Sequence, residues 1–116
     1  MALPKKNRII SKDDFRRVFK EGETVKDSFF FIKYLTNTLG HSRWSVVVPV
    51  RVSKKSVERS RIKRKITEAL KNFLNLPLDI VITATSIILE KSFDEIKRQI
   101  EKDINKISVN PVRENK

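Results

Sequence analysis

The segment from Leu78 to Thr85 is an almost uninterrupted apolar stretch in a chain that is otherwise rich in charge. A short run of this kind is typical of a β-strand at a central position in a sheet. Such a strand needs other strands beside it and helices over it. The rest of the chain must therefore supply a sheet and its cover.

The other strands are predicted upstream of this segment. Residues Glu23 to Tyr34 have a β-like composition, which predicts one long strand or two short ones with a bend near Asp27-Ser28. Asn37 to Ser42 predicts a turn, and Arg43 to Val52 predicts the next strand. Because proline has no backbone N–H, Pro49 must lie at a strand edge, a bulge or the strand's end.

Amphipathic periods predict helices on both sides of these strands. The first helix begins at Ser11, followed by acids in its first turn, and Gly22 closes it as a C′ residue. A second helix, with Ser53 or Ser56 as its N-cap, extends to about Asn75. Its apolar residues fall on one face, which leaves the opposite flank polar and basic.

A last helix follows Ser92, its predicted cap, and Pro111 is expected to end it. The order is therefore α-β-β-α-β-α, or α-β-β-β-α-β-α if the first strand is split. It predicts an α+β fold, a two-layer sandwich with helices packed on a small mixed sheet. A chain of 116 residues fits a single domain. Residues 1–10 form a basic N-terminal segment, and 108–116 are expected to be a flexible tail.

The charge of the chain indicates its class of partner. Lys and Arg number 26 against 14 Asp and Glu, which gives a formal net charge of +12. A polyanion would relieve this self-repulsion, and nucleic acid is the most common such partner. No signal peptide is recognisable and no apolar run approaches the ~20 residues of a membrane span. We therefore expect a soluble, cytoplasmic protein without a membrane or small-molecule partner.

The residue types disfavour an active site within this chain. The sequence has no cysteine and one histidine, His41, which falls in a predicted turn. A metal site needs several converging ligands, and no such cluster is present. The acidic pairs Asp13-Asp14 and Asp94-Glu95 each lie in the first turn of a predicted helix, where carboxylates stabilise the helix dipole. We predict no catalytic residue and no metal ligand.

Basic residues gather in one segment. Between positions 51 and 71 they are Arg51, Lys54, Lys55, Arg59, Arg61, Lys63, Arg64, Lys65 and Lys71. On a helix, Lys63 and Thr67 share a stripe beside the apolar face, and Arg61 projects from the far flank. A merely solvated face usually mixes signs, and a membrane helix would need the apolar face that the core uses. A polyanion interface with salt-dependent binding is therefore favoured.

Aromatic residues form a second pattern. Phe15 and Phe19 lie on one helix face, whereas Phe29, Phe30 and Phe31 are consecutive in a strand, so alternate rings point to opposite sides. Not all of them can fill so small a core. Unpaired bases stack on exposed rings at ~1–3 kcal/mol each. For each ring, core packing and base stacking both remain open.

Several motifs resemble the protein subunit of bacterial ribonuclease P. Together they cover roughly residues 5 to 106. They are Asn7-Arg8-Ile9, Asp14-Phe15, Val18-Phe19-Lys20-Glu21-Gly22, Val46-Val47-Val48, Val52-Ser53-Lys54-Lys55, Arg59-Ser60-Arg61-Ile62-Lys63-Arg64, Asp79-Ile80-Val81-Ile82 and Ala84. The basic signature from Arg59 to Arg64 is the most specific of these.

This resemblance implies an accessory subunit of a ribonucleoprotein endoribonuclease, in which the RNA subunit removes the 5′ leader of precursor tRNA by Mg²⁺-dependent hydrolysis. The RNA-subunit contacts would be Lys54, Lys55, Arg59, Ser60, Arg61, Lys63 and Arg64. The leader cleft would be lined by Phe15, Phe19, Phe31, Lys63 and Thr67. The resemblance also implies a left-handed β-α-β crossover, against the ~98% of crossovers that are right-handed.

Three features depart from the family pattern. Ser60 replaces an asparagine, Thr67 replaces an arginine, and the 55–59 connection is short and lacks a glycine. The alternative function is a ribosomal or ribosome-assembly protein that binds ribosomal RNA through the same basic helix. A sequence-reading DNA protein is disfavoured, because the basic helix is followed by a strand and no helix-turn-helix signature is present.

Overall fold

The computed structural model describes residues 3–9 and 11–114, with side chains described for 3–9 and 11–107. Its helices and strands are α1 (Lys12–Glu21), β1 (Glu23–Lys26), β2 (Phe30–Thr36), β3 (Arg43–Val47), α2 (Ser56–Leu70), β4 (Leu78–Ala84) and α3 (Phe93–Glu114). Short 3₁₀ turns lie at Lys5–Asn7, Lys71–Phe73 and Ser86–Glu90. The predicted α+β order is confirmed, in the version with the first strand split.

The bend that splits the strand is held by one side chain. The carboxylate of Asp27 accepts hydrogen bonds from the backbone N–H groups of Phe29, at 2.7 Å, and Phe30, at 3.0 Å. An aspartate that bonds the backbone in this way favours a turn over a continuous strand. Two short strands therefore form on either side of the predicted bend, and they pair with each other in antiparallel fashion.

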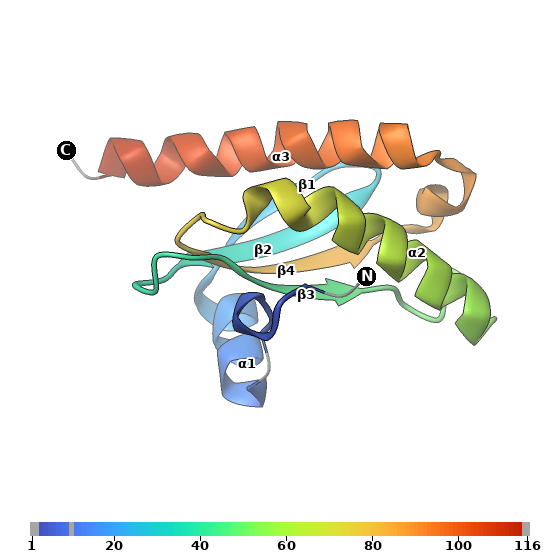
Figure 1. Ribbon diagram of the computed structural model, residues 1–116, viewed down its shortest axis with the longest axis horizontal. Helices are drawn as coiled ribbons and strands as arrows, with labels where there is room; N and C mark the ends of the chain where they lie inside the picture. The colour runs from blue at the N-terminus through green and yellow to red at the C-terminus, as the bar shows by residue number, and fades with distance from the viewer. Residues whose placement is uncertain (1–2, 10, 115–116) are drawn as a thin grey trace.

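The sheet is mixed, with strand order β1-β2-β4-β3. β4 pairs antiparallel with β2 and parallel with β3. The apolar segment is thus a central strand, as predicted. Figure 1 shows α2 and α3 over one face of the sheet and α1 on the other. In β2, Phe30 and Ile32 are buried under α2 and α3, so Phe31 points to the α1 side.

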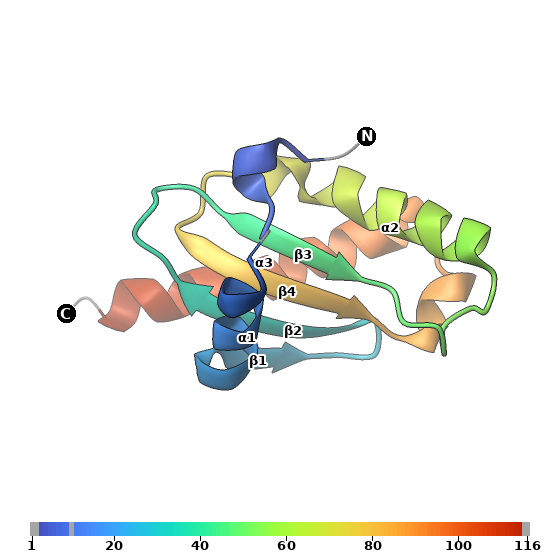
Figure 2. The same ribbon diagram turned by 90° about the horizontal axis from the view of Figure 1, so that it is seen from below.

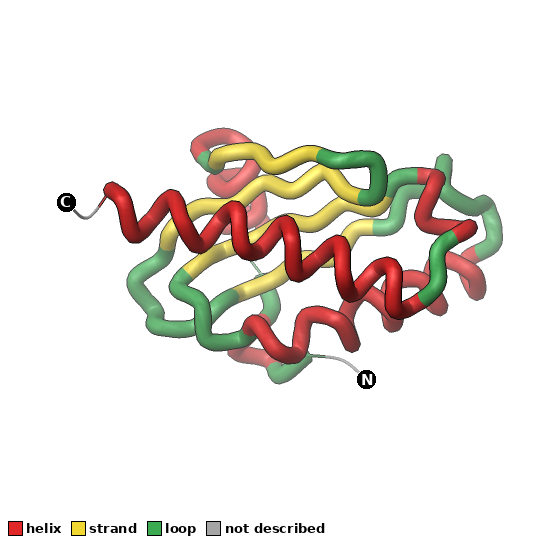
Figure 3. Tube along the Cα trace, turned by 90° about the horizontal axis from the view of Figure 1, so that it is seen from above, coloured by secondary structure: helices red, strands yellow, loops and turns green. Residues whose placement is uncertain are grey.

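The connection from β3 through α2 to β4 is left-handed, as the resemblance implied. Figure 2 views the sheet from the side away from α2. When β3 and β4 are turned to point upward in that view, β4 lies to the right of β3, while α2 runs along the outer edge of β3 on the far side of the sheet. Figure 3, from the opposite side, shows the helical layer in front of the same strands.

Gly22 ends α1 as predicted, but for a steric reason. Its backbone is extended, with φ −76° and ψ 161°, so no left-handed conformation is needed there. A Cβ at this position would lie 2.4 Å from the carbonyl oxygen of Val18 and 2.6 Å from that of Tyr34. Any side chain would push α1 away from β2, and only glycine allows the contact.

The start of α2 differs from the prediction. Its N-cap residue is Lys55, which provides no side-chain hydrogen bond, so the assignment of the cap to Ser53 or Ser56 is wrong. The Ser53 hydroxyl instead donates to Glu58 and accepts from the N–H of Lys55. The helix also ends at Leu70 instead of Asn75, because a 3₁₀ turn follows directly.

The remaining boundaries follow from backbone chemistry. β3 ends at Val47, so Pro49 lies beyond the strand's end. Ser92 and Glu95 exchange hydrogen bonds with each other's backbone N–H, which is the predicted cap of α3. α3 continues to Glu114, so the prediction that Pro111 ends it is wrong. A proline removes one helical hydrogen bond, and a helix can pass it with a kink. Residues 115–116 of the predicted tail lie outside the described residues.

Candidate RNA interface

The basic helix α2 presents cations that pair with no acid among the described residues. Arg61, Lys63 and Arg64 are exposed, and their side chains make no hydrogen bond or ion pair with any other described residue. Lys54 and Lys55, at the entry to the helix, are also exposed and likewise unpaired within the described chain. Bare cations on one element are the electrostatic signature of a polyanion surface.

Two predicted members of this surface are partly held by the protein. Arg59 is half-buried, and its Nη1 donates to the carbonyl oxygen of Ser53 at 2.9 Å. Arg59 therefore fixes the short 55–59 entry as well as adding charge. Ser60 is exposed beside it, with no hydrogen bond from its hydroxyl to a described residue. The other predicted contact residues make no side-chain hydrogen bond or ion pair with a described residue; they are Lys54, Lys55, Arg61, Lys63 and Arg64.

The cations of α2 lie on two flanks. Arg61, Arg64 and Lys65 line an open hollow on the side of α3, together with Glu68 and Phe93. Lys63 and Thr67 line a different cleft, of about 230 Å³, between α2 and the edge strand β3. One helix therefore offers positive charge to two surfaces, as its 3.6-residue period predicted.

The second cleft, which we call the edge cleft, is closed by the N-terminal segment. Its lining residues are Leu3, Arg8, Ile9, Trp44, Ser45, Val46, Lys63 and Thr67. The N–H of Ile9 donates to the carbonyl of Trp44 at 3.0 Å, in a parallel bridge. The buried side chain of Asn7 donates to the Ser42 carbonyl at 2.7 Å. The segment is therefore docked on the sheet.

The face of the sheet under α1 carries the aromatic residues. The rings of Phe15 and Phe19 lie 5.0 Å apart between centroids, and Phe19 is 38% exposed. Phe31 is half-buried on the same side of the sheet, in register with Thr83. By contrast, Phe30 is fully buried in the main core. The strand alternation thus separates a core ring from a surface ring, as predicted.

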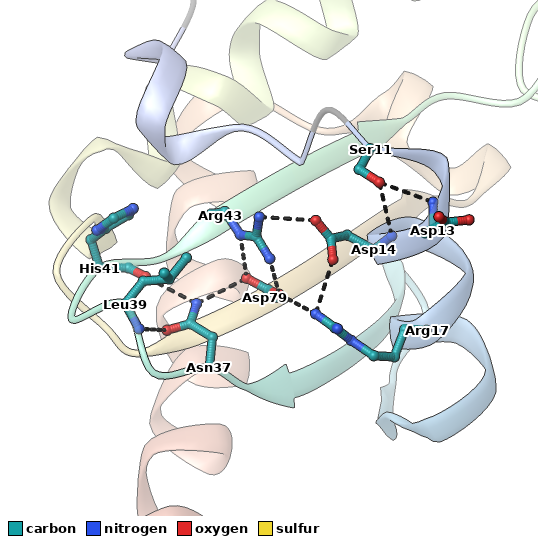
Figure 4. Close-up of polar contacts among 9 residues, drawn as sticks. All are labelled: Ser11, Asp13, Asp14, Arg17, Asn37, Leu39, His41, Arg43 and Asp79. Carbon is teal, nitrogen blue, oxygen red and sulfur yellow. Dashed lines mark hydrogen bonds and ion pairs between the residues drawn. The ribbon is translucent and has the colours of Figure 1, made fainter.

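An ion-pair cluster fixes α1 on this face (Figure 4). The buried carboxylate of Asp79 accepts from Arg43 Nε at 2.8 Å and Nη2 at 2.6 Å, and from Asn37 at 2.9 Å. Asp14 of α1 accepts from Arg43 at 3.1 Å and from Arg17 at 3.0 Å. We call these five residues the Asp79 cluster.

The charges of this cluster are mutually stabilised. Burial by itself would raise the pKa of Asp79, but hydrogen bonds from Arg43 and Asn37 hold that pKa below its ordinary value. The hydrogen bonding between Arg43 and Asp79 also raises the pKa of the Arg43 guanidinium. Asp79 is therefore ionised, and the cluster is a structural device. From sequence, Asp14 was interpreted as a helix-dipole acid, and its partner Arg43 on β3 was missed.

The position of the cluster decides which part of the sheet stays open. Figure 2 shows α1 crossing the sheet near the ends at which β3 and β4 begin. Phe15 and Phe19 lie on the flank of α1 opposite Arg17. Each is two residues from Arg17 and therefore about 160° away from it around the helix. They therefore face the ends at which β3 and β4 finish, where Phe31, Thr83 and Val47 stand in register.

Comparison with known proteins identifies the family. The family model for Ribonuclease P matches residues 3–108. The chain belongs to the ribonuclease P protein family. Relatives named ribonuclease P protein component are 29% identical in Pseudanabaena sp., over 92% of this chain and 96% of the relative, and 34% identical in Caldanaerobacter subterraneus subsp. tengcongensis, over 80% and 82%.

Solved structures agree with this assignment. A Staphylococcus aureus ribonuclease P protein, a mutant with defective mRNA degradation activity, superposes with a TM-score of 0.80 at 26% identity and covers 90% of each chain. The Thermotoga maritima ribonuclease P protein shares the fold, with a TM-score of 0.73 at 22% identity over 82% of this chain and 92% of that one.

Membership of the family establishes the function at the level of the holoenzyme. This ribonuclease P protein is the accessory subunit of a ribonucleoprotein endoribonuclease; it binds RNA, its partner is ribonuclease P RNA, and the enzyme processes the 5′ end of tRNA. The family match decides against the ribosomal alternative. In the part of the chain that the structure describes, no helix is long and apolar enough to cross a membrane.

The residues expected to line a leader cleft fall on two adjoining surfaces of the ribonuclease P protein. Phe15, Phe19 and Phe31 share the open sheet face, whereas Lys63 and Thr67 line the edge cleft. Thr67 is nearly buried, and its hydroxyl donates to the Lys63 carbonyl at 2.8 Å. Arg8 of the edge cleft was missed as a site residue, although it belongs to the Asn7-Arg8-Ile9 motif.

A second buried acid forms no ion pair with any described residue. Asp103 of α3 is fully buried, and burial together with the neighbouring carboxyl group of Asp27 raises its pKa to about 7. Gln99 donates to Asp103 Oδ1 at 3.2 Å. Within the described residues, no group of three or more His, Cys, Asp or Glu is placed to hold a metal ion. His41 lies in the turn before β3, where its backbone carbonyl accepts from Asn37.

Proposed function

We propose that the two flanks of α2 divide the two RNA contacts of the holoenzyme. The α3-side flank, with the helix entry, docks ribonuclease P RNA through Lys54, Lys55, Arg59, Ser60, Arg61 and Arg64. The β3-side flank, with Lys63 at the boundary, receives the 5′ leader of precursor tRNA. The observation that carries this division is that the unpaired cations of one helix line two separate hollows.

The open sheet face completes the leader surface in this proposal. A single-stranded leader has unpaired bases that can stack on aromatic rings, and Phe19 and Phe31 offer rings beside the positive edge of the sheet. Thr67 contributes no charge where an arginine is usual. Lys63 and the N-terminal Arg8 supply positive charge around it. The leader would follow the sheet from Phe31 toward β3.

The chemistry in this proposal belongs to the RNA subunit, which uses Mg²⁺ to activate water and stabilise the leaving group. The protein screens the repulsion between two polyanions, which lowers the Mg²⁺ concentration at which the enzyme is active. We place this reaction in the cytoplasm. No residue of this chain is assigned a catalytic role in this proposal.

Reconstitution tests the proposed function. The purified protein, combined with the ribonuclease P RNA of its own organism at low Mg²⁺, should accelerate 5′-leader removal, and the gain should shrink as Mg²⁺ rises. Arg98 is an exposed cation on α3, outside the proposed RNA surfaces, so Arg98→Ala should accelerate leader removal as the wild type does. An absence of acceleration across salt and Mg²⁺ concentrations would overturn the proposal.

A further inference from the structure

The edge cleft differs from other hollows on the surface in its charge. Three further hollows in the described chain each contain a carboxylate, Asp14 in two of them and Glu68 in the third. The lining of the edge cleft includes two cations, Arg8 and Lys63, and no acid. Its cations come from opposite walls, Arg8 from the N-terminal segment and Lys63 from α2.

The floor of the cleft is the unpaired edge of β3. The carbonyl of Trp44 accepts from Ile9, so the backbone groups of Trp44 point away from β4. Backbone direction alternates along a strand, and the N–H and carbonyl of Val46 therefore point to the same open edge. Neither group has a partner among the described residues. A bare N–H on an edge strand is a fixed hydrogen-bond donor.

Ser45 also lines the cleft. Side chains alternate along a strand, and Trp44 and Val46 pack on the main core, so the Ser45 side chain points to the opposite face of the sheet. The backbone of β3 therefore supplies the donor at this floor. The walls are held in place, because the bridge to Trp44 fixes Arg8 and the Thr67 hydroxyl is used within α2. The cleft thus joins a fixed neutral donor to two cations, in a volume of about 230 Å³.

We propose that the edge cleft binds one phosphate group of an RNA backbone, with the Val46 N–H as donor and Arg8 and Lys63 as counter-charges. Hydrogen bonds from such donors to an anion are about twice as strong as those between neutral groups. This inference rests on the proposed function only for the identification of RNA as the source of the phosphate group. It adds a phosphate site that is built from the N-terminal segment and the β3 edge as well as from α2.

The test uses the full chain labelled with ¹⁵N and two probes, inorganic phosphate and a single-stranded hexauridylate. Both should shift the Val46 amide resonance, and the hexauridylate should bind more tightly. Arg8→Gln should weaken hexauridylate binding about tenfold, the usual effect of losing one charge-assisted hydrogen bond. Arg98→Gln, which makes the same charge change on exposed α3, should alter it less than twofold.

Val46→Pro removes the backbone donor without changing charge, and an edge strand tolerates proline. It should weaken hexauridylate binding about tenfold while the circular dichroism spectrum stays that of the wild type. Ser45→Ala is the neutral control, because its side chain points to the opposite face of the sheet, and it should bind hexauridylate as the wild type does. If Arg8→Gln binds hexauridylate as the wild type does, the phosphate site is wrong.

Two further arms identify the source of the phosphate and separate the two proposals. Loss of affinity for precursor tRNA with a leader, but not without one, would assign the phosphate to the leader. Loss of affinity for isolated ribonuclease P RNA would assign it to the RNA subunit. If Arg8→Gln changes the affinity for neither precursor tRNA nor ribonuclease P RNA, the phosphate site is wrong. The proposed function would still be supported if the wild type accelerates leader removal.

Discussion

Cations are paired with carboxylates in one region of this protein and lack such partners in another. In the Asp79 cluster, cations from α1 and β3 meet two carboxylates at hydrogen-bond distance. On α2 and the β3 edge, the cations Arg61, Lys63 and Arg8 have no acid partner among the described residues. Both regions border the same sheet. The difference shows that a net charge of +12 is a sum of paired charges, which fix the fold, and unpaired ones, which are left for a ligand.

The contrast between these regions predicts opposite effects of removing a charge. Loss of a member of the Asp79 cluster should damage stability, because its partner remains buried without compensation. Loss of a bare cation should damage RNA binding and leave stability almost unchanged, since an exposed side chain contributes little to folding. Stability and RNA affinity, measured on the same variants, therefore separate the two kinds of charge.

The largest effect is expected for Asp79→Ala. The substitution leaves Arg43 with only Asp14 as its acidic partner, and breaking a buried pair costs about 3–5 kcal/mol. Urea denaturation should show a loss of about 3 kcal/mol in the free energy of unfolding. Asp13→Ala is the control, because Asp13 is exposed in a pair with Arg16 and should change stability by less than about 0.5 kcal/mol. Equal losses in the two variants would show that the buried pairs of the Asp79 cluster stabilise the fold no more than an exposed pair does.

Asp103 sharpens the contrast, because it is as buried as Asp79 and its pKa moves the other way. Its neighbours are Asp27, Gln99 and, at longer range, Lys106. Since its pKa rises to about 7 in the folded state, its contribution to stability is complete below the unfolded pKa of about 3.9 and is lost as the pH rises through 7.

Thermal unfolding between pH 5 and 8 measures this effect. The wild-type midpoint should fall by several degrees across the window, because each unit of pKa difference corresponds to about 1.4 kcal/mol. Asp103→Asn should abolish the fall and raise the midpoint at pH 8, since an amide can donate to Asp27 at any pH. Asp94→Asn, at an exposed position of the same helix, should keep the wild-type slope. A flat wild-type profile would show that the acid pair does not share a proton.

The limits of sequence reasoning follow the same division. The bare flank of α2, the Ser92 cap and the central strand were predicted because each depends on residues close together in the chain. The Asp79 cluster was not, because Asp14, Arg43 and Asp79 meet only through the sheet topology. An aspartate inside an apolar strand was the available signal that a cation had to lie opposite it. The left-handed crossover came from resemblance alone, and Arg8 was missed because its role depends on the docking of the N-terminal segment on β3.

The two flanks of α2 should separate by mutation. Arg61→Ala with Arg64→Ala should weaken binding of ribonuclease P RNA about tenfold and reduce the slope of log affinity against log salt by roughly 0.7–0.9 for each phosphate that the variant no longer binds. Lys63→Ala should instead reduce the affinity difference between precursor tRNA with and without its leader. Filter binding across salt concentrations measures both quantities. If Lys63→Ala and the double variant affect the same binding step, the division of α2 into two surfaces is wrong.

The smallest effect is expected at an uncharged site, Phe19. A base stacked on an aromatic ring contributes ~1–3 kcal/mol, and because Phe19 is only 38% exposed and shares its surface with Phe15, we expect about a fivefold loss of leader affinity in Phe19→Ala. Phe93→Ala is matched in residue type and in its 38% exposure, but Phe93 lies beside Arg61 on the other flank of α2. It should leave the leader's contribution to precursor tRNA binding unchanged. Because neither substitution alters net charge, the salt dependence of both variants should remain that of the wild type. A changed slope in Phe19→Ala would mean that the ring acts by positioning cations, and the open sheet face would then belong with the charged surface instead of forming a separate stacking platform.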